Sequence, residues 1–530
     1  MAKGGVVNST RGVSQGFGFG RRVWRWALVL AVALPVALVA LVLVPQRERV
    51  VGTPLGSQYS GAAHAAVKTS PQNMGSWTAP QSLGLVGIHA ALLYGTGNVL
   101  FWTVGNNNTG SRAVIWNPTT GTVQANNFPD SYDIFCAGES LLPNGQVLVT
   151  GGVDGKVGKN GKLEDAGIPQ ATLFNPSTST WSQAANMNYA RWYPTNLELQ
   201  DGTTLVASGD DANVQLVLPM EEYNYQTNTW TLLPTSADIE ASDFTYPRMV
   251  LLTNGNVFLG GQSATTMMFN PTTNQWSTVG TLQYGVRRYG GMVLLPGLNK
   301  VLHAGGNQTD QSGPATNTVE EIDFSQPKPA WQYVASMHYP RQNENLVLMP
   351  DGTVLAVGGG EGWGAYSNPV YQPEIYNPAN NTWTLMNSQQ VQRTYHSTAL
   401  LVPDGRVVSA GSDWGTMEQT YEVFSPPYLF KGTRPSITSA PSSLTYGQNF
   451  TITTPNAASI IRVALIKVAS TTHATRFDER FVDLKFSIGS GQITATAPPS
   501  GAYAPPGYYM LDILNSNGVP AVMPFVLLSS

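Results

Sequence analysis

Short apolar segments alternate with turn residues along most of the chain, and this pattern repeats about every fifty residues. Each unit has an apolar segment, a tight turn, a second apolar segment that often ends in glycine, and a third segment before a turn of the Asn-Pro type. The first turns of the units are Gly97-Asn98, Asn144-Gly145, Asp201-Gly202, Asn254-Gly255, Leu298-Asn299, Asp351-Gly352 and Asp404-Gly405. Asn-Gly and Asp-Gly favour the positive φ angles of two-residue hairpins. The repeat therefore predicts an all-β domain, a seven-bladed β-propeller over residues 74–432.

The chain before the first unit carries a segment that matches the third segment of a later unit. Ser76-Trp77-Thr78 corresponds to Thr382-Trp383-Thr384 in its place relative to the strands that follow. We therefore expect the N-terminal end of the domain to supply the outer strand of the last blade, which hides an exposed sheet edge. Tryptophans follow most of the later turns, and we interpret them as packing between blades rather than as ligand contacts. They are Trp181, Trp230, Trp276, Trp331 and Trp383.

The repeat ends after Pro427, and shorter alternating strands follow. Examples are the segments 450–453 and 508–511, which Pro and Gly turns separate from their neighbours. This pattern predicts an immunoglobulin-like β-sandwich over residues 433–530.

The first fifty residues differ from the rest of the chain. An uncharged apolar stretch covers residues 26–44, and a helix of that length spans roughly 28 Å, close to the hydrocarbon thickness of a bilayer. The basic residues before it are Lys3, Arg11, Arg21, Arg22 and Arg25. Because a basic flank favours the cytoplasm, we expect residues 1–50 to be a cytoplasmic tail and membrane anchor, 51–73 a linker, and the remainder extracytoplasmic. A cleaved signal segment, which would leave the protein secreted, is the alternative, although no A-x-A pattern follows Val44.

Charge and cysteine content narrow the function. Only 11% of the residues are charged and the formal net charge is -4. This argues against nucleic acid as a partner, because phosphate binding needs a basic surface. The single cysteine, Cys136, cannot form an internal disulfide, so stability is expected to come from packing. On its own, such a cysteine is most often a small buried apolar residue.

Counting back from the hairpin turns places reactive side chains at one level. Cys136, Tyr193 and His396 each lie eight residues before the first turn of their unit. Equal offsets in equivalent blades predict equal heights around one axis. Tyr395 precedes His396, and His473 lies in a loop of small polar residues in the C-terminal domain, from which it could complete a site at the axis. A sulfur, two phenols and imidazoles suit a transition metal such as copper or zinc, although each residue alone has a simpler structural interpretation.

Other histidines are weaker candidates. His89 begins the first inner strand and could face the axis, but its offset does not match that of Cys136. His303 stands beside glycines in a second strand, and we interpret it as structural.

Taken together, four segments resemble the galactose oxidase and glyoxal oxidase group of copper-radical oxidases, from residue 75 to the end of the chain. They are Phe135-Cys136-Ala137-Gly138, Ala190-Arg191-Trp192-Tyr193-Pro194, Arg393-Thr394-Tyr395-His396-Ser397 and Thr472-His473-Ala474-Thr475. The Arg-Trp-Tyr-Pro form is closer to glyoxal oxidase. The resemblance implies a kelch-like propeller with one copper ion, a substrate that is a small aldehyde, a primary alcohol or a glycan, and reduction of O2 to hydrogen peroxide. We expect a monomer.

The resemblance also implies a role for each residue. Cys136 and Tyr193 would be joined by a thioether bond that forms after folding, and Tyr193 would bind copper and carry the tyrosyl radical. Tyr395 would be the axial ligand and the base that takes the substrate proton. His396 and His473 would be the nitrogen ligands.

One stretch departs from the galactose oxidase pattern. Residues 207–213 lack the tryptophan that stacks on the modified tyrosine, and Trp192, Trp363 and Trp414 are the possible substitutes. The alternative function is a non-catalytic cell-surface propeller that binds carbohydrate or protein, because one fold serves many functions. That alternative predicts an unmodified Cys136 thiol and no dependence on copper.

Overall fold

The computed structural model describes residues 70–105, 110–154, 166–240, 245–261, 263–309, 313–362, 368–413 and 416–529. Within these ranges the chain is almost wholly β-structure. The exceptions are the helix α1 (Pro71–Met74) and three single 3-10 turns, Thr235–Ala237, Pro427–Phe430 and Ala457–Ser459. The all-β prediction is therefore confirmed.

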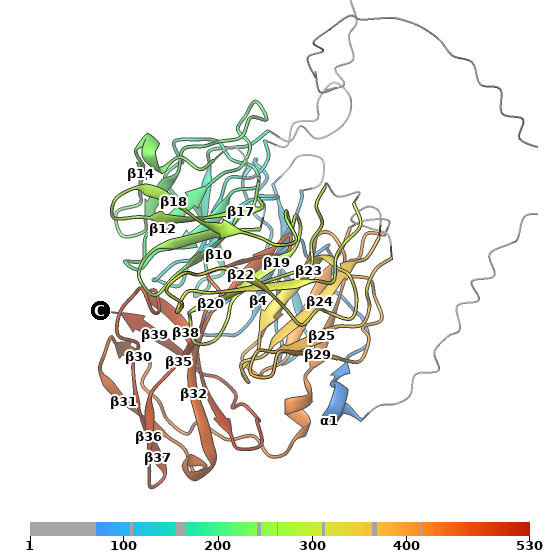
Figure 1. Ribbon diagram of the computed structural model, residues 1–530, viewed down its shortest axis with the longest axis vertical. Coiled ribbons are helices and arrows are strands. Elements are labelled where there is room, and N and C mark those ends of the chain that lie inside the picture. The colour runs from blue at the N-terminus through green and yellow to red at the C-terminus, as the bar shows by residue number, and fades with distance from the viewer. Residues whose placement is uncertain are drawn as a thin grey trace, which may run out of the picture. The chain divides into compact units, whose positions relative to one another are not determined.

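Small antiparallel sheets follow one another along the repeat, and each is built mainly from consecutive strands (Figure 1). The first sheet contains β3 (His89–Leu92), β4 (Val99–Thr103), β5 (Arg112–Trp116) and β6 (Val123–Ala125). The second contains β7 (Gly138–Leu141), β8 (Val147–Thr150), β9 (Ala171–Asn175) and β10 (Thr180–Gln183). The third contains β11 (Thr195–Glu198), β12 (Thr204–Ala207), β13 (Glu221–Asn224) and β14 (Thr229–Leu232).

The later sheets keep the same order from the inner to the outer strand. The fourth contains β15 (Arg248–Leu251), β16 (Val257–Gly260), β17 (Thr265–Asn270) and β18 (Gln275–Thr281). The fifth contains β19 (Gly291–Leu294), β20 (Lys300–Ala304), β21 (Val319–Asp323) and β22 (Trp331–Val334). The sixth contains β23 (Gln342–Leu348), β24 (Val354–Gly360), β25 (Glu374–Asn377) and β26 (Thr382–Leu385). The seventh contains β27 (Ser397–Leu401), β28 (Val407–Gly411) and β29 (Thr420–Ser425), with β1 (Ser76–Trp77) and β2 (Gln81–Ser82) at its edge.

The sheets close into a ring. The inner strands β7, β11, β15, β19, β23, β27 and β3 lie against one another in that order. At the outside, Ser76 and Trp77 of β1 pair with Ser425 and Phe424 of β29, so the start of the domain supplies the outer strand of the last sheet, as its sequence predicts. This circular order of sheets is that of a β-propeller.

The tryptophans of the repeat join neighbouring sheets. The indole N–H of Trp181 donates to the Asn126 carbonyl at 3.1 Å, and that of Trp230 donates to the Ala185 carbonyl at 2.7 Å. Each acceptor lies just beyond the outer strand of the preceding sheet. For these tryptophans the interpretation as packing between blades is confirmed.

A buried ion pair recurs in four of the described sheets and has no counterpart in the sequence predictions. An arginine before the inner strand pairs with a glutamate of the third strand of the same sheet. The pairs are Arg191–Glu221 at 3.0 Å, Arg287–Glu320 at 2.8 Å, Arg341–Glu374 at 3.0 Å and Arg393–Glu422 at 3.3 Å. Each arginine thereby fixes the loop that leads into the axis, because breaking a buried pair leaves an uncompensated charge.

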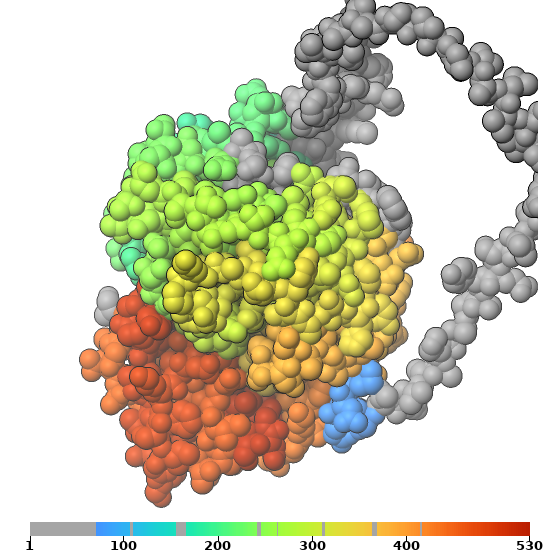
Figure 2. All heavy atoms as spheres, in the orientation of Figure 1, coloured from blue at the N-terminus to red at the C-terminus, as the bar shows by residue number. Residues whose placement is uncertain are grey.

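The C-terminal residues form two further sheets, which pack beside the repeat (Figure 2, red). One has the strand order β30 (Ser443–Thr445), β39 (Phe525–Ser529), β38 (Gly507–Asn515), β32 (Ile460–Lys467) and β35 (Phe481–Asp483). The other has the order β31 (Asn449–Thr453), β37 (Gln492–Thr496) and β36 (Phe486–Gly489). Ile452, Leu465 and Leu511 are buried in the core that these strands share.

One hairpin of the C-terminal part enters the propeller. It is formed by β33 (Ser470–Thr472) and β34 (Thr475–Phe477), and β33 pairs with β3 so that Thr472 lies opposite His89. The same hairpin lies against β7, β11, β19 and β27. It therefore occupies the axis around which the inner strands are arranged.

Among the residues that the structure describes, no helix is long and apolar enough to cross a membrane. The apolar stretch 26–44 and nearly all of the linker lie outside those residues. The membrane anchor therefore stays a prediction.

Candidate metal centre

One backbone position recurs at the start of every inner strand. In each blade, the residue six positions further along donates its N–H to the carbonyl that closes the inner hairpin. In the second blade that residue is Leu142, which donates to the Gln146 carbonyl at 2.9 Å. Six of the seven residues at this position have positive φ: Cys136 (57°), Tyr193 (62°), Tyr246 (52°), Tyr289 (61°), Asn343 (62°) and His396 (61°). We call these six the ring residues. A non-glycine residue in this conformation costs on the order of 1–2 kcal/mol, so the surrounding structure must enforce it.

Backbone hydrogen bonds between blades enforce this conformation. The N–H of Tyr193 donates to the Cys136 carbonyl at 2.9 Å, and the N–H of Tyr246 donates to the Tyr193 carbonyl at 2.8 Å. The N–H of Asn343 likewise donates to the Tyr289 carbonyl at 2.7 Å. These bonds hold the joined ring residues of neighbouring blades at one height, as the equal sequence offsets of Cys136 and Tyr193 predict.

The five predicted site residues meet at this level. The Cys136 Sγ lies 3.5 Å from the Nε2 of His473, and ligand atoms of Cys136, His396 and His473 all lie within 4.8 Å of one another. The hydroxyls of Tyr193 and Tyr395 are 2.5 Å apart. The His473 ring centroid lies 4.3 Å from that of His396, 4.8 Å from that of Tyr193 and 5.3 Å from that of Tyr395.

The two imidazoles are oriented by the nitrogen that faces away from the site. The Nδ1 of His396 lies 2.6 Å from the Oδ2 of Asp413, and the Nδ1 of His473 lies 2.6 Å from the Oγ1 of Thr472. Thr472 donates its own proton to the Ile88 carbonyl at 2.8 Å, so it accepts from His473. Both imidazoles therefore keep the Nε2 lone pair for a ligand.

This donor set fits a copper ion. The Nε2 of His396 is buried and has no hydrogen-bond partner among the described residues, so it is available to coordinate a metal. Two imidazole nitrogens with two phenol oxygens are donors that an oxidised transition metal accepts.

Burial sets the protonation states in the site. It lowers the pKa of His473 well below its ordinary value, helped by the nearby His396 and His89, so this imidazole is neutral and able to bind a metal. Burial also raises the pKa of the Tyr193 phenol well above its ordinary value, and the neighbouring Cys136 and Tyr395 add to the shift. A divalent cation reverses such a shift, because it stabilises the phenolate.

Two residues at the start of the fourth blade support the site, and the sequence analysis identifies neither of them. The Tyr246 ring lies 4.7 Å from the Tyr193 ring and 4.9 Å from the His473 ring. Arg248 donates to the carbonyls of Tyr246 at 2.8 Å and His473 at 3.3 Å, and also to the Thr475 hydroxyl. Arg248 thus fastens the turn that carries His473. Tyr246 lies eight residues before Asn254, so the offset that selected Cys136 would have found it.

The structure answers one question about the stacking aromatic. The Trp192 ring stacks on the Tyr193 ring, with centroids 3.9 Å apart and an interplanar angle of 26°. Trp363 and Trp414 lie outside the described residues.

Comparison with known proteins agrees with this geometry. The family described as Glyoxal oxidase N-terminus matches residues 104–428, and the family described as Galactose oxidase-like, Early set domain matches residues 434–528. The chain belongs to this glyoxal oxidase and galactose oxidase family of copper-radical oxidases, as its motifs predict.

Several relatives are named as oxidases. A galactose oxidase of Gibberella zeae is 30% identical over 500 residues, which cover 86% of this chain and 71% of that protein. Aldehyde oxidase GLOX of Vitis pseudoreticulata is 30% identical over 444 residues, 75% of this chain and 82% of the relative. A fungal alcohol oxidase solved in complex with copper matches 86% of this chain and all of its own, with a TM-score of 0.77 and 25% identity.

Proposed function

We propose that this protein oxidises a small aldehyde or a primary alcohol by two electrons and reduces dioxygen to hydrogen peroxide, as a copper-radical oxidase of the glyoxal oxidase type. The observation that carries the proposal is the convergence of two phenols and a thiol on two imidazoles whose Nε2 atoms face one point. A propeller that only binds carbohydrate or protein would not need such donors, and the relatives named above are oxidases.

In this proposal Tyr193, Tyr395, His396 and His473 hold the copper ion. When bound, copper acidifies the substrate hydroxyl and takes up one of the two electrons. Tyr395 accepts the substrate proton as general base. The Tyr193 ring supplies the second oxidising equivalent as a tyrosyl radical, which the thioether to Cys136 stabilises by delocalisation.

The protein environment favours these roles. Cys136 is fully buried, and the Trp192 ring covers one face of the half-buried Tyr193 ring. Asp413 and Thr472 hold the Nδ1 atoms of the two imidazoles and so fix the ring orientation that turns each Nε2 toward the site.

The proposal includes the organisation of the whole chain. Residues 74–432 form the seven-bladed propeller with the copper site, and residues 433–530 form the sandwich that supplies His473. Residues 1–50 anchor the protein to the membrane and 51–73 link the anchor to an extracytoplasmic enzyme, which acts as a monomer on a small aldehyde, an alcohol or a glycan.

Peptide mapping tests the proposal most directly. The purified full-length protein is loaded with copper in air, alkylated, digested and analysed by mass spectrometry. We expect the Cys136 and Tyr193 peptides to be covalently joined and lighter by two hydrogens, whereas protein kept under nitrogen should remain unjoined. A freely alkylated Cys136 after copper loading would contradict the proposal and favour the non-catalytic alternative.

Replacing Tyr395 by Phe tests the assigned base. We expect turnover to fall by about 10²–10⁴-fold, because a positioned general base contributes that much. The matched control is Tyr333→Phe, since Tyr333 is 48% exposed and outside the site. Peroxide release is measured across a panel of aldehydes, alcohols and sugars, and full activity of Tyr395→Phe would remove the role of Tyr395.

A further inference from the structure

The backbone N–H of Cys136 has an acceptor unlike that of the next ring residues. Tyr193 and Tyr246 each donate their N–H to the carbonyl of the ring residue before them. The N–H of Cys136 instead donates to the Nε2 of His89 at 2.9 Å. Both residues are fully buried, so no solvent can replace this acceptor.

The first sheet explains the exception. Its equivalent of the ring position is Gly87, six residues before Leu93, and Gly87 does not have the positive φ of the others. The Gly87 carbonyl accepts from the Thr398 hydroxyl at 3.0 Å. The side chain of His89, two residues further along, accepts the N–H of Cys136 as a ring carbonyl accepts those of Tyr193 and Tyr246.

The imidazole of His89 is held on both nitrogens. A backbone N–H can only donate, so the Nε2 that accepts from Cys136 carries no proton. The ring proton is therefore on Nδ1, and it is donated to the Oε1 of Glu139 at 2.6 Å. The ring also stacks on Trp102, with centroids 4.8 Å apart and planes 9° apart. His89 consequently has no nitrogen left to bind a metal.

We propose that His89, oriented by Glu139, is a positioning residue that holds the backbone of Cys136 at positive φ so that its thiol can join Tyr193. The inference rests on the proposed function, because it concerns the formation of the thioether. It goes beyond that function by assigning the first blade a role in building the radical site.

Dioxygen is the oxidant in the thioether-forming reaction that His89 assists. The S–H bond of Cys136 and one ring C–H bond of Tyr193 break, and one S–C bond forms. Two protons and two electrons leave the protein and reduce O2 to hydrogen peroxide. His89 takes no part in this transfer; it only fixes the position from which the sulfur reacts.

The rate of thioether formation tests the proposal. The full-length protein is expressed without copper, copper is added in air, and the fraction of joined Cys136 and Tyr193 peptides is followed over time. His89→Leu removes the acceptor, and we expect joining to slow by about tenfold or more, because an unmet buried donor is costly. Copper affinity, measured under nitrogen, should change less than threefold, since His89 is not a ligand.

Two further variants keep the test decisive if His89→Leu does not fold. Glu139→Gln retains an oxygen that accepts from the Nδ1 of His89, so its thioether should form at close to the normal rate. In Glu139→Leu, thioether formation should be slowed as it is in His89→Leu. His338→Leu is the matched control, because His338 also pairs with a glutamate, Glu374, at 2.7 Å but lies outside the site.

The possible outcomes separate this proposal from the proposed function. If the unaltered protein forms no thioether, the oxidase proposal fails. If it does, and His89→Leu or Glu139→Leu joins at the normal rate, the positioning role is overturned. Equal losses of copper affinity and of joining rate would also overturn it, because they indicate a general structural role.

Discussion

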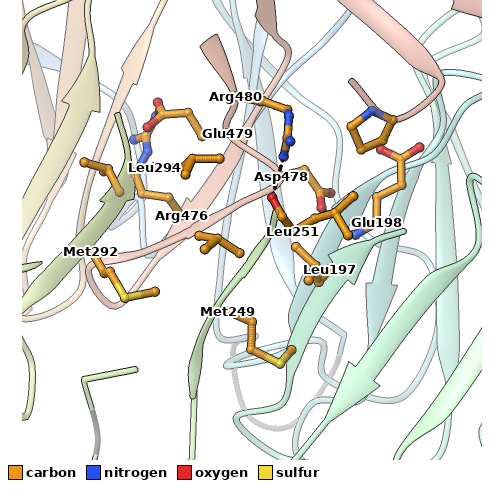
Figure 3. Close-up of a pocket in the computed structure, with 13 residues that line it drawn as sticks. Leu197, Glu198, Met249, Leu251, Met292, Leu294, Arg476, Asp478, Glu479 and Arg480 are labelled. Carbon is orange, nitrogen blue, oxygen red and sulfur yellow. Dashed lines mark hydrogen bonds and ion pairs between the residues drawn. The ribbon is translucent and has the colours of Figure 1, made fainter. Parts of the chain in front are cut away.

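The hairpin β33–β34 has two ends whose buried polar groups are arranged in opposite ways. At its tip, His473 has one nitrogen tied to Thr472 and directs the other to a point that His396, Tyr193 and Tyr395 share. Just beyond its base, charged residues line a pocket between the hairpin and strands β11, β15 and β19 (Figure 3). The two clusters lie close together in the sequence, but only one has the properties of a reactive site.

The pocket beyond the base is internally compensated. Asp478 accepts hydrogen bonds from the Ser140 hydroxyl at 2.6 Å and the Glu198 N–H at 2.7 Å. Arg480 donates to the carbonyls of Leu251 at 2.8 Å and Ala502 at 2.7 Å. The labelled side chains in Figure 3 include these two residues, and the dashed line from Arg480 reaches Leu251.

Ion pairs complete this compensation. Arg476 pairs with Glu479, and Lys467 of β32 reaches Glu198 of the propeller. The charges thus fasten the C-terminal part to the propeller. Buried charge by itself is therefore a poor guide to function in this protein, whereas the convergence of sulfur, phenol and imidazole groups on one point is a good one.

Breaking the Lys467–Glu198 pair should have the largest effect. Lys467→Met leaves the Glu198 carboxyl buried without its cation, and we expect the free energy of unfolding to fall by about 3–5 kcal/mol. Chemical denaturation measures the change. The double variant Lys467→Met with Glu198→Leu should recover most of the loss, and an unchanged stability of the single variant would show that the pair does not fasten the two parts.

Removing the imidazole at the tip should affect copper rather than stability. For His473→Ala we expect copper affinity to fall by more than about 100-fold, which is the upper range for losing an outer partner of a ligand. Titration with copper under nitrogen measures it, and His338→Ala serves as the control because its side chain is 46% exposed. An unchanged copper affinity of His473→Ala would show that His473 does not bind copper and that the tip, like the base of the hairpin, is not a metal site.

The smallest effect on copper affinity is expected for Asp413, which contacts the ligand His396 rather than the metal. Asp413→Asn weakens the acceptor for the Nδ1 of His396, and the expected loss of copper affinity is about 10–100-fold. Asp323→Asn, at the end of β21, is the control and should leave the copper affinity unchanged. A loss as large as that in His473→Ala would instead indicate that Asp413 approaches the metal itself.

The repeat explains why much of the site can be predicted from local sequence. A residue at a fixed offset from a hairpin turn keeps its height in every blade, because strand pairing fixes the register. Cys136, Tyr193 and His396 follow from that rule, and so does Tyr246, which the rule would also have selected. The family motifs then distinguish the reactive positions from Tyr289 and Asn343, which share the same backbone geometry.

The distance of a residue from its hairpin turn does not predict its contacts with segments that are far away in the sequence. The pairing of β33 with β3 brings His473 to the axis, and His89 meets Cys136 only because the first blade lacks a ring residue. Asp413 becomes the partner of His396 across a turn of its own sheet. Each of these contacts depends on how closed sheets and an inserted hairpin fit together.

The repeating sheets, the height of the reactive residues and the family can be read from the amino-acid sequence, because each depends on local periodicity or on short motifs. The folded arrangement is needed to know which nitrogen of each imidazole faces the site, which charges are compensated, and what supports the backbone of Cys136. These features arise where chain segments far apart in sequence pack together, and there burial and hydrogen-bond geometry, rather than residue type, determine what a side chain does.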